Sequence, residues 1–181
     1  MMARYGMLID TTKCIGCYAC RTACQRQNSL LPDEAFIRYE QREVGSYPDV
    51  NVESVPLQCM HCEDAPCAQV CPTGAAHMGA DGIVEVDQGR CIGCLYCMAA
   101  CPYQVRVRNS ETGAVDKCRF CTVSAEESGT KMCSCVEACP TGARLFGDLD
   151  DPDSQIVAEI TRTKAAPIAG DLTKSKVFYV R

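Results

Sequence analysis

Several residue types and signals that mark common classes of protein are scarce in this sequence or missing from it. It has no tryptophan, four phenylalanines and two histidines in 181 residues. No stretch approaches the ~20 consecutive apolar residues of a membrane-spanning helix. The opening residues, MMARYGMLID, contain neither the apolar core of an export signal nor a pair of arginines. We therefore expect this chain to have no membrane span and no export signal of its own.

The sequence also lacks the signatures of enzymes that bind nucleotides or cleave substrates. It contains no GxGxxG or phosphate-binding loop, and no serine or aspartate stands beside His61 or His77 in the pattern of a catalytic triad. The net charge is -5, acidic residues gather at 148–153, and no long basic run is present. We therefore expect no active site in this chain and no nucleic acid partner.

Cysteine is the residue that the sequence has in excess, with 17 copies that fall into four groups. The groups are Cys14, Cys17, Cys20 and Cys24; Cys59, Cys62, Cys67 and Cys71; Cys91, Cys94, Cys97 and Cys101; and Cys118, Cys121, Cys133, Cys135 and Cys139. Groups one and three read C-x2-C-x2-C-x3-C, and group two has two more residues in its middle gap. Every group but the first ends in Cys-Pro, at Pro72, Pro102 and Pro140.

This spacing is typical of bacterial ferredoxins, which bind 4Fe-4S clusters. A cysteine at every third residue lets one tight loop turn three thiolates toward one cluster, and the last cysteine of the other run supplies the fourth ligand. About one helical turn separates the third cysteine from the fourth, as in CAQVC and CMAAC. The proline that follows then ends the helix. The sequence therefore predicts duplicated ferredoxin modules that bind iron–sulfur clusters.

Two other uses of cysteine are less compatible with this pattern. CxxC pairs also bind zinc, and Cys118-x2-Cys121 alone would be ambiguous. Disulfides are disfavoured because the number of cysteines is odd and no export signal is visible. Within group four, Cys135 keeps the x3 spacing to Cys139 and Cys133 does not, so we expect Cys133 to be a spare thiol.

Local patterns predict the other elements of an α+β fold. YGMLID, GIVEVD and ARLFGDL read as short strands, and residues 36–44 and 50–55 read as a β-hairpin between groups one and two. Asp153 or Ser154 is expected to cap a helix through QIVAEITRTK, and KVFYV reads as a last strand. This tail is too polar for an independent domain, so we expect it to wrap the modules or meet a partner. Four basic residues flank cysteines and could raise cluster potentials locally, but we expect them to be solvated: Arg21, Arg90, Lys117 and Arg119.

With these motifs the chain resembles the four-cluster iron–sulfur subunit of the DMSO reductase family of molybdenum or tungsten oxidoreductases, of the polysulfide and thiosulfate reductase type. The resemblance covers nearly the whole chain. It rests on CIGCYACRTAC, REVGSYP, CMHCEDAPCAQVCPTGA, CIGCLYCMAACPY, KCRFC, CVEACPTGARLFGDLDDPDS and KVFYV. The chain departs from the family in SGTKMCSC, where the gap in group four is longer and contains the extra thiol.

The resemblance implies a nested pairing of the groups, one with four and two with three, and four 4Fe-4S clusters. The implied ligand sets are Cys14, Cys17, Cys20 and Cys139; Cys118, Cys121, Cys135 and Cys24; Cys59, Cys62, Cys67 and Cys101; and Cys91, Cys94, Cys97 and Cys71. The implied architecture is an outer module of residues 1–35 and 110–150, an inner module of residues 56–109, an inserted hairpin of residues 36–55 and a tail of residues 151–181.

The function that the resemblance implies is electron transfer, without substrate chemistry in this chain. The expected partners are a large catalytic subunit with a bis-pterin guanine dinucleotide cofactor of molybdenum or tungsten, and a quinone-linked membrane anchor or another redox protein. The expected location is peripheral to the membrane, reached by export in the folded state with a partner that carries a twin-arginine signal; cytoplasmic residence is the alternative. Two other functions remain open, a relay subunit of a hydrogenase or another respiratory complex, and a free polyferredoxin.

Overall fold

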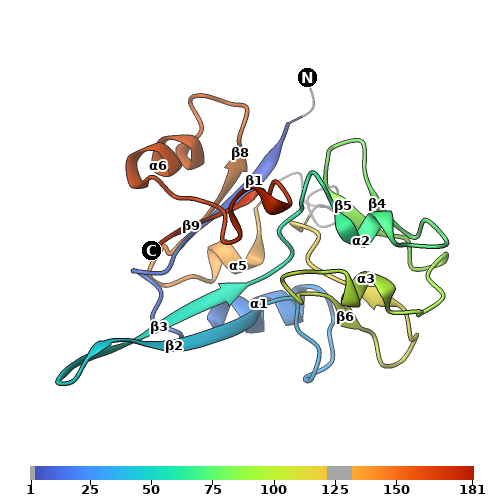
Figure 1. Ribbon diagram of the computed structural model, residues 1–181, viewed down its shortest axis with the longest axis horizontal. Coiled ribbons are helices and arrows are strands. Elements are labelled where there is room, and N and C mark those ends of the chain that lie inside the picture. The colour runs from blue at the N-terminus through green and yellow to red at the C-terminus, as the bar shows by residue number, and fades with distance from the viewer. Residues whose placement is uncertain (1–2, 122–131) are drawn as a thin grey trace.

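The computed structural model describes residues 3–121 and 132–181 of the chain, in which short strands and helices alternate (Figure 1). The strands are β1 (Tyr5–Asp10), β2 (Arg38–Ser46), β3 (Asp49–Leu57), β4 (Ala76–Met78), β5 (Val84–Val86), β6 (Val107–Arg108), β7 (Val115–Asp116), β8 (Arg144–Asp148) and β9 (Val177–Val180). The helices are α1 (Ala19–Gln27), α2 (Pro66–Gln69), α3 (Tyr96–Ala99), α5 (Ser134–Glu137) and α6 (Gln155–Thr163), with a 3-10 turn at Gly170–Leu172. The expected mixture of helices and strands is confirmed.

The largest sheet joins segments from the two ends of the described chain. Its order is β8-β1-β9, with β1 antiparallel to β8 and parallel to β9. Met7 and Ile9 of β1 and Val177 of β9 are completely buried, as expected for apolar residues of a central strand and its neighbour. Helix α6 follows residue Ser154 and packs on β8 and β1 (Figure 1). The strands and the helix predicted for these segments are confirmed.

The hairpin predicted between the first two cysteine groups is formed by β2 and β3, which pair antiparallel around Tyr47 and Pro48. It extends away from the body of the molecule (Figure 1). Its tip is solvated, with Tyr47 93% exposed, whereas Val55 and Leu57 at its base are buried. The base of the hairpin therefore belongs to the core, and the β3 strand leads directly into the second cysteine group.

Each cysteine group has a helix that begins one residue before its third predicted ligand, and these helices differ in length for a reason visible in the sequence. Helices α2, α3 and α5 have four residues each, and each is followed by a Cys-Pro pair. Helix α1 has nine residues, because Cys24 has no proline after it and the helix continues to Gln27. The expected turn between the third and fourth cysteines is therefore present in all four groups, and in the first group the helix continues beyond it.

The cysteine helices meet in two pairs. Helix α1 packs against α5, and α2 packs against α3. Two small antiparallel sheets, β4-β5 and β6-β7, adjoin the second pair (Figure 1). Most of the buried apolar residues, among them many of the cysteines, form one continuous cluster.

The C-terminal tail wraps the rest of the molecule, as expected. The Thr173 hydroxyl lies 2.7 Å from the Tyr103 hydroxyl, Lys174 pairs with Asp64, and the Lys176 Nζ donates to the Gly82 carbonyl at 2.5 Å. The next residues enter the large sheet as β9. The tail thus ties the large sheet to the segment around the second cysteine group. Within the described residues, no helix combines the length and the apolarity needed to cross a membrane.

Replacement of Ile156 by alanine is expected to destabilise the protein. Ile156 is 1% exposed and lies against Gly147, where an added Cβ would come within 2.9 Å of its Cγ2. Loss of this buried side chain should lower the free energy of unfolding by about 2–5 kcal/mol. The exposed Thr161→Ala on the same helix should change it by no more than about 0.5 kcal/mol. Thermal unfolding of the iron-loaded variants, followed by circular dichroism, measures both, and equal effects would contradict the packing of α6.

Candidate metal centres

Strand pairing decides which cysteine groups come together. Ile9 at the end of β1 lies opposite Arg144 at the start of β8, so the first cysteines after β1 and the last cysteine before β8 are at the same end of the sheet. Ala76 of β4 lies opposite Val86 of β5, which brings Cys71 and Cys91 to one end of that hairpin in the same way.

The loops of groups one and three share a conformation that the sequence C-I-G-C permits. Gly16 and Gly93 have φ angles of 65° and 67°, and an added Cβ would lie 2.7 Å from Ser54 Oγ and 2.8 Å from the Gly113 carbonyl oxygen, respectively. Only glycine fits both the angle and the space. The residues before the helices, Tyr18 and Leu95, are also left-handed.

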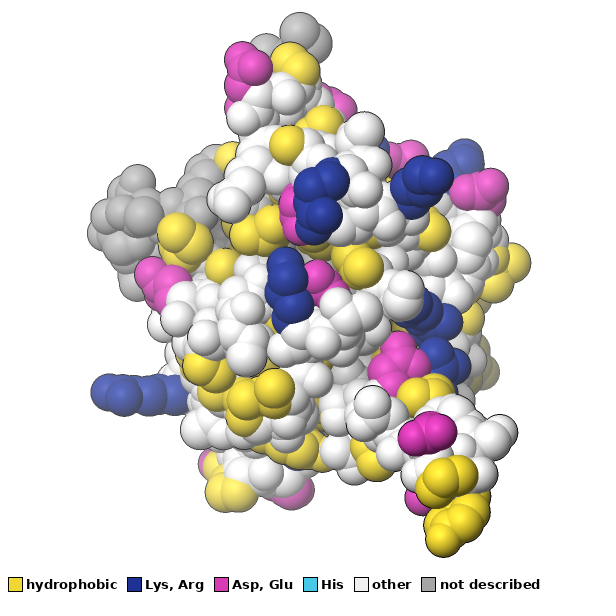
Figure 2. Space-filling model, turned by 90° about the vertical axis from the view of Figure 1, so that its left-hand side faces the viewer, with side chains coloured by type: hydrophobic (Ala, Val, Ile, Leu, Met, Phe, Trp, Pro, Cys, Tyr) yellow, Lys and Arg dark blue, Asp and Glu magenta, His cyan; other side chains and the backbone are white. Residues whose placement is uncertain are grey.

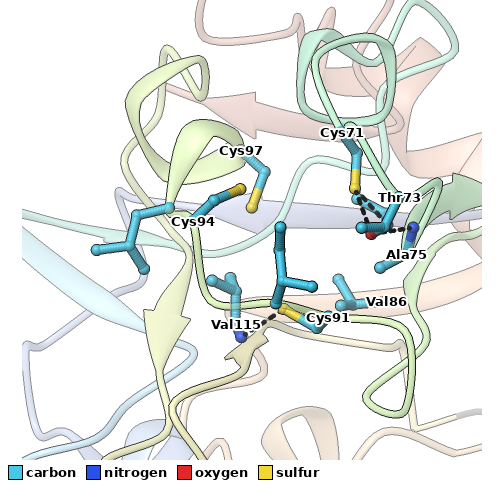
Figure 3. Close-up of a pocket in the computed structure, with 11 residues that line it drawn as sticks. Cys71, Thr73, Ala75, Val86, Cys91, Cys94, Cys97 and Val115 are labelled. Carbon is cyan, nitrogen blue, oxygen red and sulfur yellow. Dashed lines mark hydrogen bonds between the residues drawn. The ribbon is translucent and has the colours of Figure 1, made fainter.

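Three cavities are each lined by four of the cysteines. Site I contains Cys14, Cys17, Cys20 and Cys139, site II contains Cys59, Cys62, Cys67 and Cys101, and site III contains Cys71, Cys91, Cys94 and Cys97. The empty space is about 330 Å³ in sites I and II and about 310 Å³ in site III. Figure 3 shows the four thiols of site III around a common space. The structure thus gathers twelve of the sixteen predicted ligands into three sets of four.

The remaining predicted ligands, Cys24, Cys118, Cys121 and Cys135, are near one another and are called site IV. Burial, and then the charges of Cys135 and Cys121, raise the pKa of Cys24 to about 12. Burial raises the pKa of Cys118 as well, with smaller contributions from Cys24 and Cys135. Without a metal, Cys24 and Cys118 would therefore stay protonated, and a bound metal is what would favour their thiolate form.

Cys133 also lies at site IV, immediately before α5. It is 1% exposed, and its thiol donates a hydrogen bond to the Phe120 carbonyl at 3.3 Å. Hydrogen bonding from Cys133 lowers the pKa of Cys121 to about 6 and that of Cys135 to about 7. The Cys133 thiol thus lies beside the sulfurs of Cys121 and Cys135, to either of which its single S–H could donate in place of the Phe120 carbonyl.

Backbone amides donate to the cysteine sulfurs at equivalent places in the repeats. The N–H of Ala76 lies 3.3 Å from Cys71 Sγ, and the N–H of Ala143 lies 3.3 Å from Cys139 Sγ, each after a Pro-Thr-Gly turn. Burial raises the pKa of both thiols, but these amides and the adjacent threonine hydroxyls outweigh it, so that both pKa values lie below the usual value. Such hydrogen bonds stabilise thiolates and tune the potential of a bound cluster.

Two buried arginines at these sites were not identified from the sequence. Arg144 is 2% exposed and lines site I, and its Nη1 lies 3.7 Å from Cys135 Sγ of site IV. Arg106 is 6% exposed and lines site II. Each stands five residues after the last cysteine of its group, Cys101 or Cys139. This shared offset is the signal that could have revealed them.

Lys117 and His61 lie inside the molecule near site IV. The expectation that Lys117 is solvated is wrong: it is completely buried, and its Nζ donates to the Cys118 carbonyl at 2.9 Å. His61 is stacked on Phe120 with ring centroids 3.9 Å apart. Burial, and then the positive charge of Lys117, lower the pKa of His61 well below its usual value. His61 therefore packs as a neutral ring inside the molecule.

The donors and their surroundings fit 4Fe-4S clusters. Sites I to III each offer four thiols in a mostly apolar cavity. In residues 3–121 and 132–181, no three His, Cys, Asp or Glu side chains are close enough to hold a single metal ion. Nη1 and Nη2 of Arg106 and Nη2 of Arg144 are buried without a hydrogen-bond partner. Since an uncompensated buried cation is costly, these groups call for a negatively charged centre beside them.

Comparison with known proteins gives consistent matches. Two family models, both described as 4Fe-4S dicluster domain, match residues 13–75 and 50–149. The sequence is 46% identical to Protein NrfC of Escherichia coli (strain K12) over 89% of its own length and 72% of that protein. It is 45% identical to the thiosulfate reductase electron transfer subunit PhsB of Salmonella typhi, over 84% of its own length and 80% of that protein. It is 40% identical to the B polypeptide of the polysulfide reductase of Wolinella succinogenes, over 99% and 95% respectively.

The assignment of Cys135 rather than Cys133 as a ligand makes a prediction for the two serine variants. Cys133→Ser should keep the full iron content, because Cys133 is outside the predicted ligand set and a serine hydroxyl can take over its hydrogen bond to the Phe120 carbonyl. Cys135→Ser should lose about four iron atoms, the content of one cluster. Iron and acid-labile sulfide are measured on protein purified without oxygen. The reverse result would exchange the roles of the two residues.

Proposed function

The chain belongs to the family of proteins with 4Fe-4S dicluster domains, and we propose that it relays single electrons between a molybdenum or tungsten pterin catalytic subunit and a quinone-linked membrane subunit or another redox partner. When bound, each cluster takes up or releases one electron with little covalent change. The observation that carries the proposal is the convergence of four thiols on each of three cavities.

The sixteen cysteines of sites I to IV are proposed as the ligands of four 4Fe-4S clusters. The contact of α1 with α5 and of α2 with α3 supports a nested arrangement, in which residues 1–35 and 110–150 enclose an inner module of residues 56–109. Residues 36–55 are then an insertion and residues 151–181 a tail. Cys133 remains a hydrogen-bond donor outside the ligand set.

The proposed order of the relay is site I, site IV, site II and site III. Arg144 lines site I and contacts Cys135 of site IV. In the hairpin β6-β7, Val107 lies opposite Asp116. Because Cys101 of site II precedes β6 and Cys118 of site IV follows β7, both cysteines are at the same end of this hairpin. Cys17 of site I and Cys94 of site III are exposed, whereas Cys118 and Cys59 of the two middle sites are buried. The protein keeps water away from the middle of the relay and leaves its ends near the surface.

The partners and the location of the complex are proposed from the relatives. Two relatives are named as parts of a thiosulfate reductase and of a polysulfide reductase. This supports a separate catalytic subunit that carries out the substrate chemistry. Export in the folded state, with a partner that bears a twin-arginine signal, would place this protein beside a membrane without a span of its own.

Copurification and metal analysis test the proposed function. The protein, purified without oxygen from its own host, should contain about sixteen iron atoms and should bring with it a larger subunit that contains molybdenum or tungsten. Redox titration followed by electron paramagnetic resonance should show four one-electron centres. Nickel in the partner would indicate a hydrogenase instead, and a monomer that accepts electrons from several donors would indicate a free polyferredoxin. Zinc in place of iron would contradict the proposal.

A further inference from the structure

Arg106 and Arg144 occupy equivalent positions in two of the four repeats. Each stands five residues after a cysteine that is followed by proline, and each leads into a strand. After Cys71 the same position holds Ala76. The two arginines therefore belong to the repeats that end with Cys101 and Cys139.

Arg144 lies between sites I and IV. It lines the site I cavity, while its Nη1 donates to Gln58 Oε1 at 2.6 Å and lies 3.7 Å from Cys135 Sγ of site IV. Its Nη2 has no hydrogen-bond partner, and none of the ion pairs in the described part of the chain includes it. Its nearest source of negative charge is therefore the sulfur of the two sites.

Arg106 has the corresponding place between sites II and III. It lines the site II cavity, and both Nη atoms are buried without a hydrogen-bond partner. Burial lowers the pKa of Arg106. The charges of Cys67 and Cys59 of site II and of Cys97 of site III outweigh this effect and raise the pKa above its usual value. The guanidinium therefore lines the site II cavity and also lies beside Cys97 of site III.

We propose that each arginine is a fixed charge that raises the reduction potential of the two clusters it separates, Arg144 those of sites I and IV and Arg106 those of sites II and III. The proposal rests on the ligand sets of the proposed function. Reduction makes a cluster one unit more negative, and a nearby positive charge in a poorly solvated interior stabilises that added charge. A guanidinium remains positive at every pH at which the protein is folded. Each arginine is thus a positioning residue that acts through the clusters.

Two neutral variants test this inference in the full-length protein. Arg144→Gln and Arg106→Gln should each lower the equilibrium constant for reduction of two of the four clusters at least tenfold, which is about 59 mV for one electron. Titration followed by electron paramagnetic resonance on protein purified without oxygen measures the four steps. The two variants should move different pairs of steps, and the double variant should move all four. No assignment of a signal to a site is needed beforehand.

Arg90→Gln is the matched control. Arg90 also carries a guanidinium next to a ligand, Cys91, but it is exposed and binds the Thr73 carbonyl at 2.7 Å. Because water screens an exposed charge, its removal should change each reduction constant by less than about threefold. A shift as large as that of the buried variants would show that burial is not what makes Arg106 and Arg144 effective.

The lysine variants separate charge from packing. Arg144→Lys and Arg106→Lys keep the positive charge, so their potentials should remain closer to those of the parent protein than the glutamine variants do. If a glutamine variant loses iron and the corresponding lysine variant keeps the full iron content, the requirement for positive charge is supported. If the lysine variant also loses iron, the arginine is needed for packing and the inference is overturned. Full iron content with unchanged potentials, or equal shifts of all four clusters in each single variant, would also overturn it. A parent protein without four iron–sulfur centres would instead refute the proposed function.

Discussion

The convergence of thiols from distant segments is the constraint on which the rest of this structure depends. Cys139 joins Cys14, Cys17 and Cys20 only because β8 runs antiparallel to β1, with Arg144 opposite Ile9. The strands themselves are short, and the chain offers no tryptophan and few phenylalanines for a conventional core. Metal binding can supply folding free energy that such packing lacks. The small sheets thus hold the cysteine loops in position, because their strand pairing brings loops from distant segments to the same end of a sheet.

The charges inside the molecule follow from the same constraint. Lys117, Arg106 and Arg144 are almost completely buried, and no carboxylate pairs with them in the described residues. In a protein without a cofactor this would be strongly destabilising, since buried charges need partners. Thiolates on iron–sulfur clusters supply the missing negative charge. The fold and its cofactors therefore share one electrostatic balance, and the positive side chains are as much part of the sites as the cysteines.

Local patterns in the sequence predicted the elements better than their meeting points. Alternation identified the β2-β3 hairpin, and the proline after Cys71, Cys101 and Cys139 identified where short helices end. The burial of Arg144 and Lys117 could not be read locally, because both are polar residues whose surroundings come from segments far away in the chain. The pairing of the cysteine groups likewise depends on strand register, which spacing alone leaves open. Family resemblance, rather than spacing, suggested which groups meet.

The two ends of the proposed relay are built alike. Ile15 and Ile92 follow the first cysteine of groups one and three, and they are 68% and 67% exposed over sites I and III. On the face shown in Figure 2, hydrophobic side chains are exposed among charged ones. In sites II and IV no cysteine is exposed: Cys101 and Cys121 are half-buried and the other six are buried. Electrons can therefore enter or leave at either exposed loop without bringing water to the middle sites. In the proposed relay each of the two buried arginines belongs to one terminal site and its inner neighbour, so that the two halves resemble each other in the placement of charge.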